Sequence, residues 1–289
     1  MKVFKILAYI LAIFALCTIV FYVTLYFSDS AVCLAVKNNL SKNIGDFLWG
    51  TIGIILTFVS TLFLFLTFNS QQKQNKEMNE DAFRTRFEGT FFNMLAMYYN
   101  VRTEADKQIS QSSKFGTKNL NDFYHEFNKF YKQQLSKNSD FSEAMSFLEK
   151  KDILKTEMQT AIYDLGSLYD LYIGKQGCGA GFYFRYIHNL ITFVLNHWNG
   201  KCNDIHTYLN FIQAQMSDEE LALVFYDSIS NRGQDKKRKY TFKENLDEYS
   251  FLENISENSL IQRCHYKIFP KTMFIFLNDD ERRTVVKYL

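Results

Sequence analysis

The chain contains only one proline and 12 glycines among its 289 residues. These two residue types are the strongest breakers of helices, so their scarcity favours long helices. The apolar residues agree, because Phe83, Phe87 and Phe91 recur every four positions, as on one face of a helix, and similar spacing continues downstream. Ser217, followed three residues later by Glu220, is typical of a capping box at a helix start. We therefore predict an all-α fold.

Charge is missing from two runs near the N-terminus, Ile6–Phe27 and Phe47–Phe68, each 22 residues long. As a helix, each would extend ~33 Å, which matches the ~30 Å hydrocarbon core of a bilayer. The first run is longer than the apolar part of a signal peptide, although a cleaved signal is the alternative. The sequence thus predicts a two-helix transmembrane hairpin in residues 1–70 and a cytoplasmic helical domain in residues 71–289.

Basic residues are scarce between the two runs, where the two lysines are balanced by two aspartates. Lys2 and Lys5 precede the first run, while Arg84 and Arg86 follow the second. Since Lys and Arg stay on the cytoplasmic side of a membrane, both termini should be cytoplasmic. No ionisable residue lies inside either run, which argues against a transporter or proton relay.

Bulky side chains are missing from one face of the second run. Small residues recur there at helical spacing: Gly50, Gly53, Thr57, Ser60 and Thr61. Small residues allow helices to approach closely in lipid, so this face either docks on the first span or packs between copies of the chain. We expect a homo-oligomer on activation.

Signatures of metal, cofactor and nucleophile sites are also missing. The five cysteines form no C-x-x-C pair, and no H-E-x-x-H occurs, so we predict no metal, cofactor or disulfide framework. Residues 173–181 contain four glycines but lack the G-K-[ST] ending of a phosphate-binding P-loop, which favours an interhelical turn. Cys178 in that turn is more typical of a small apolar side chain than of a nucleophile with His188 or His197 as its base.

Two polar motifs remain. Arg185 and His188 lie one helical turn apart. This spacing favours a buried polar network, because it is shorter than the R-x4-6-H signature of helical nucleases. The alternative is a pair that binds an anion or cleaves RNA. The second motif is a run of four cations in the polar segment 231–243, which is either a solvated loop or a contact for nucleic acid or anionic lipid. Its residues are Lys236, Lys237, Arg238 and Lys239.

Three separated blocks, within residues 71–100, 183–188 and 213–221, resemble the phage abortive infection proteins of the AbiC type. Gln213 departs from that pattern, because an arginine is expected there, and this argues against anion binding at that position. The resemblance implies an antiviral effector without assigned catalytic residues. It also implies a retron partner, a reverse transcriptase with multicopy single-stranded DNA, because related two-span proteins are the toxic component of such systems.

The predicted function is a membrane effector of antiphage defence that impairs the lipid bilayer when activated, with no enzymatic activity. One alternative is a membrane-tethered RNase or nucleotide-degrading toxin that uses Arg185 and His188. Another is a scaffold without toxicity.

Overall fold

The computed structural model of the chain describes most of its second half and part of its first. The described residues are 53–112, 116–176, 179–198, 202–232, 241–279, Glu281 and a few separate positions between Ile13 and Thr24. Helices dominate these residues and none of them forms a strand, so the all-α prediction is confirmed for this part of the chain. The chain divides into two compact units, residues 1–86 and 87–289.

Helix α3, Gly53–Ser112, contributes to both units. Its most apolar window has a mean hydropathy of 1.8 and is only 6% buried. It is the one helix among the described residues that is long and apolar enough to cross a membrane, which is weak support for membrane association. Most of the first predicted span and the connecting loop lie outside the described residues, so the two-helix hairpin remains a prediction.

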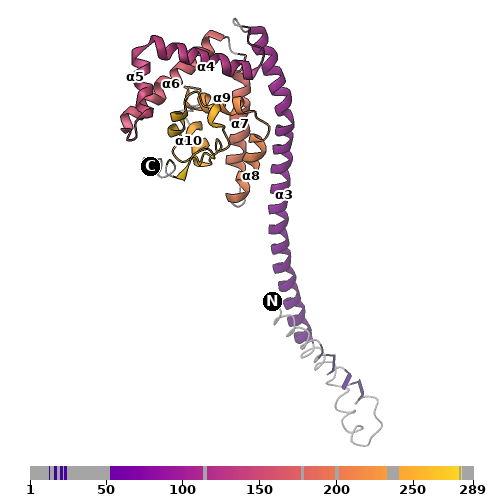
Figure 1. Cartoon of the computed structure of the whole chain (residues 1–289). Helices are drawn as coiled ribbons and strands as arrows, with labels where there is room; N and C mark the ends of the chain where they lie inside the picture. The colour runs from indigo at the N-terminus through magenta and orange to yellow at the C-terminus, as the bar shows by residue number, and fades with distance from the viewer. Residues whose placement is uncertain are drawn as a thin grey trace, which may run out of the picture. The chain divides into compact units, whose positions relative to one another are not determined.

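The second unit begins at Phe87, the first side chain of α3 that belongs to its core. Figure 1 shows α4, α5 and α6 gathered in one group and α7 and α8 in another, with α9 and α10 between them. The helices are α4 (Leu120–Lys137), α5 (Ser139–Glu149), α6 (Lys155–Gln176), α7 (Gly181–His197), α8 (Cys202–Gln213), α9 (Asp218–Ile229) and α10 (Phe242–Glu248), followed by the 3-10 helices η2 (Glu257–Ser259) and η3 (Arg263–Ile268).

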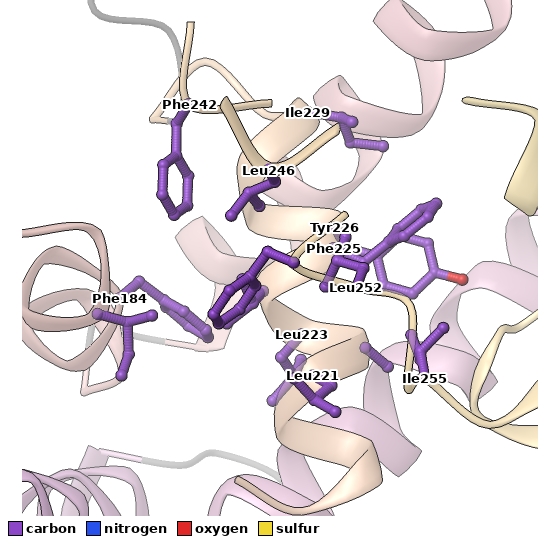
Figure 2. Packing of buried hydrophobic residues seen from close by; sticks show 14 of the residues in the cluster. Phe184, Leu221, Leu223, Phe225, Tyr226, Ile229, Phe242, Leu246, Leu252 and Ile255 are labelled. Carbon is purple, nitrogen blue, oxygen red and sulfur yellow. The ribbon is translucent and has the colours of Figure 1, made fainter. Parts of the chain in front are cut away.

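Helix α9 is the centre of this unit. The predicted capping box starts it, because Ser217 Oγ accepts from the Glu220 N–H and the Glu220 carboxylate accepts from the Ser217 N–H at 2.7 Å. Every residue of α9 from Glu220 to Ile229 is buried, and α9 packs on α4, α6 and α10. In Figure 2, Phe184 and Phe242 lie on one side of α9 and Ile255 lies on the other. On a helix surrounded in this way, a polar group costs free energy unless it has a hydrogen-bond partner.

A buried histidine fastens the C-terminal segment to α4 and α9. The Tyr131 hydroxyl donates to Gln262 at 2.7 Å, so it accepts from Nε2–H of His265 at 3.3 Å. The Tyr226 hydroxyl accepts from the Ile261 N–H and therefore donates to His265 Nδ1 at 2.9 Å. Burial lowers the pKa of His265 to about 3, and a neutral ring with one N–H meets both partners.

The apolar run Met273–Leu277 is short enough in sequence to suit a strand or a helix, but it forms neither. Phe274 and Leu277 are buried while Ile275 is exposed, and the Ile275 N–H donates to the Glu253 carbonyl at 3.0 Å. Turns between these residues place two large side chains in the core without a regular element. Short apolar runs do not distinguish these outcomes by periodicity.

Candidate functional site: a polar cavity beside helix α9

A cavity of about 360 Å³ opens among the start of α7, the end of α9 and the start of α10. Helix α7 lines it with Gly181, Phe184, Arg185 and His188. The remaining lining residues are Asp227 near the end of α9, Arg232 just after that helix, and Phe242 at the start of α10. Two guanidinium groups, an imidazole and a carboxyl group thus border one space.

The positions of Arg185 and His188 on α7 explain why both residues reach the cavity. Tyr183, Phe184 and Ile187 are buried on the core side of this helix, so Arg185 and His188 fall at its border. Arg185 is exposed and His188 is half-buried, with its ring centroid 4.3 Å from that of Phe242. The structure brings both residues to the lining of one cavity.

Asp227 is the unusual group of the cavity. Only 6% of this residue is exposed, and its Oδ1 atom has no hydrogen-bond partner among the described residues. Burial raises the pKa of Asp227 to about 7, the nearby Arg232 opposes that rise and the carboxylate of Asp170 adds to it. A proton is therefore exchanged near neutral pH at a group aimed at the cavity.

The turn after α9 is held by Asp170 of α6. The Asp170 Oδ2 atom accepts from the backbone N–H of Asn231 at 3.0 Å and from its side-chain amide at 2.9 Å. The Nε atom of Arg232 lies 3.8 Å from Asp170 Oδ1. A Cβ built on Gly181 would lie 3.3 Å from Nη1 of Arg232, so this guanidinium lies against the first residue of α7. These contacts place a cation at a helix N-terminus.

A second buried acid, Glu220, lies at the opposite end of α9. Its Oε1 atom is 2.7 Å from Nε of Arg102 on α3, and its Oε2 atom accepts from the Tyr98 hydroxyl at 3.2 Å. Burial raises the pKa of Glu220, although the Ser217 N–H and Arg102 oppose that rise. The capping box located Glu220 in the sequence, but nothing in the sequence indicated Arg102 as its partner.

The other predicted residues lie away from the cavity or outside the described residues. Gly53 has nothing within 4 Å of a built Cβ, and Thr57, Ser60 and Thr61 are exposed. Val59 and Leu66, on another face of α3, are buried. Gly50 and the cations Lys236, Lys237, Arg238 and Lys239 are outside the described part, as is Cys178. A helix-packing role for the small residues and a phosphate-contacting role for the cations stay predictions.

Gln213, which departs from the arginine expected in the AbiC-type pattern, has a structural role. Its side-chain amide donates to the Phe251 carbonyl, and its oxygen accepts from the amide of Asn254 at 2.7 Å. The residue is buried and ties the end of α8 to the turn after α10. No group of His, Cys, Asp and Glu able to hold a metal ion occurs in the described part of the chain.

Residues 179–260 match the family described as "Putative phage abortive infection protein". This match supports the resemblance to the abortive infection proteins of the AbiC type. The match contains two of the three blocks that carried the resemblance in the sequence and extends beyond them, but it does not reach the block within residues 71–100. Every residue that lines the cavity lies inside the abortive infection match. No curated protein and no solved structure matches the chain.

Proposed function

We propose that this protein of phage defence is a membrane effector, anchored in the bacterial inner membrane through a two-helix hairpin and toxic through that hairpin. The observation that carries the proposal is the first part of α3. Phe58, Leu64 and Phe65 are each more than half exposed in a segment without charge. Exposed apolar surface of this extent needs lipid or a partner to cover it.

The same helix supplies side chains to the core of the second unit, where Phe91 is fully buried and Arg102 pairs with Glu220. A change of state in the cytoplasmic domain therefore has a continuous helix through which to act on the membrane segment. Such coupling requires a partner that binds two states unequally. The proposed partner is a reverse transcriptase with its multicopy single-stranded DNA, which would hold the effector inactive.

Thr57 is exposed and a Cβ built on Gly53 would meet nothing within 4 Å, which supports contact between copies of the chain in the active state. Gly53→Leu or Thr57→Leu adds bulk that forces helix backbones apart, so each should abolish both toxicity and loss of membrane potential while the protein remains inserted. Phe58→Trp, which enlarges an exposed side chain on another face, is the matched control and should leave toxicity unchanged. Full toxicity of both leucine variants would reduce the hairpin to an anchor.

The second candidate function is a membrane-tethered RNase or nucleotide-degrading toxin. The juxtaposition of Arg185, His188 and Asp227 at one cavity favours it, because a cation, an imidazole and a carboxyl group of raised pKa can serve in acid–base chemistry. Arg185→Lys and His188→Gln separate the two functions. The membrane proposal predicts unchanged depolarisation by the folded variants. Loss of toxicity in them, with RNA degraded in wild-type cells before the potential falls, would support the enzyme.

A further inference from the structure

The cavity beside α9 has the size and the chemistry of a small-ligand site. Its volume of about 360 Å³ lies within the range of ~300 to 1,000 Å³ that is usual for such sites. Its walls include the rings of Phe184 and Phe242, each only 4% exposed, beside the half-buried imidazole of His188. Aromatic walls of this kind suit a flat heterocycle.

One end of the cavity is suited to an anion. Helix α7 begins after Ala180 without a side-chain cap, so its first N–H groups can donate to an acceptor from outside the helix. The guanidinium of Arg232 lies against Gly181 at that helix start, and Arg185 is exposed one turn further along. Uncapped N–H groups, the helix dipole and two guanidinium groups together favour a phosphate.

Asp227 shows that the ligand is more than a simple anion. Its carboxyl group lines the same cavity, is more than nine-tenths buried and leaves Oδ1 without a hydrogen-bond partner among the described residues. A buried acceptor of this kind costs free energy until a donor reaches it. Inorganic phosphate alone supplies little for this group, whereas the N–H or O–H groups of a base or sugar match it.

We propose that this cavity binds a free nucleotide, with its phosphate at the start of α7 near Arg232 and Arg185 and with donors of its base or ribose on Asp227. The inference concerns the cytoplasmic domain alone and does not rest on the membrane proposal. The abortive infection match contains the whole site. Two other cavities, one beside Asp122 and Lys132 and one beside Glu244 and Lys271, have no guanidinium group in their lining.

The test is calorimetric titration of the full chain in detergent micelles with AMP, GMP, CMP and UMP, with inorganic phosphate and with a 12-nucleotide thymidine strand. At least one nucleotide should bind about tenfold or more tightly than phosphate. Arg232→Gln should weaken nucleotide binding about 10- to 100-fold, as expected for loss of a charge-assisted hydrogen bond. Lys132→Gln, which removes an exposed cation elsewhere, should leave binding unchanged.

Asp227→Asn separates a nucleotide site from a plain anion site. It should weaken the nucleotide about tenfold while leaving phosphate binding equal or tighter, because a negative group is removed. Should Arg232→Gln melt below the wild-type chain, Arg185→Gln replaces it, since Arg185 is exposed. Phosphate binding as tight as any nucleotide, binding of the thymidine strand alone, no binding at all, or insensitivity to Asp227→Asn would each overturn the proposal.

Discussion

The crossing of α6 and α9 depends on the absence of a side chain at Gly166. A Cβ built there would lie 2.4 Å from the Ile229 carbonyl oxygen and 3.2 Å from the Cα atom of Ser230. Both are backbone atoms, so a rotamer change cannot relieve the contact and the two helices must move apart. Because α9 packs on three other helices, that movement disturbs the surrounding core. Gly166→Ala should therefore destabilise the domain.

The size of this effect follows from two opposing terms. Replacing glycine by alanine inside a helix gains about 1 kcal/mol, whereas overpacking a core costs about 1 to 3 kcal/mol. Contact with fixed backbone at 2.4 Å places the cost near the upper end, so the net loss should be about 1 to 2 kcal/mol. At roughly 2 to 4 °C per kcal/mol for a domain of this size, Tm should fall by about 2 to 8 °C.

Gly174 provides the matched control, because it lies in the same helix and has nothing within 4 Å of a built Cβ. Gly174→Ala should leave Tm unchanged or raise it slightly. The assay is thermal unfolding of the full chain in detergent micelles, followed by far-ultraviolet circular dichroism at one protein concentration. If Gly166→Ala melted at or above the wild-type temperature, the close crossing of α6 and α9 would be refuted.

Three further predictions concern charge and topology. Asp227 binds a proton more tightly in the folded state, where its pKa is about 7, than at its ordinary pKa of 3.8. The domain should therefore lose up to about 4 kcal/mol of stability as the pH rises from 3.8 to 7. Asp227→Asn should remove this dependence of stability on pH in denaturant titrations. Glu220→Gln should cost about 1 to 3 kcal/mol, because the half-buried guanidinium of Arg102 loses its charged partner. Glu219→Gln next to it should change stability by less than about 0.5 kcal/mol. A membrane-impermeant thiol reagent should label Cys33, between the two apolar runs, in intact cells. The additional label on a Ser136→Cys variant should appear only after permeabilisation. Labelling of the introduced cysteine in intact cells would overturn the cytoplasmic placement of the domain.

Periodicity predicted α4, α6, α7 and α8 because each of them buries one face. The spacing of Phe123, Phe127 and Tyr131 marks the buried face of α4, and the Ser217 capping box gave the start of α9. Helix α5 was not predicted, because its 11 residues offer only one short apolar face. The segment after residue 248 escaped prediction because turns and 3-10 helices have no apolar period of their own.

The cavity was predictable only in part. Arg185 and His188 stood out because polar groups one turn apart on an apolar helix need an explanation. Arg232 and Asp227 did not stand out, since only the folded chain brings the end of α9 to the start of α7. One sequence signal was present for Asp227, which is the only charged residue in the mostly apolar run from Leu221 to Ile229. A charged residue is rarely buried without a partner, so a carboxyl in such a run needs an explanation.

The two buried acids of α9 lie between the cavity and α3. Glu220 and Asp227 lie about two turns apart on one helix that is packed on all sides, so neither can shift without the other. Asp227 faces the cavity, and Glu220 pairs with Arg102 on α3, the helix that also carries the exposed apolar segment. A ligand that engages Asp227 would change the balance at Glu220 only by favouring one of two packings of α9. Glu220→Gln should then weaken any effect of the bound ligand on toxicity while leaving the affinity of the purified chain for the ligand intact. Measuring toxicity and ligand affinity in the same variant decides whether α9 couples the cavity to α3.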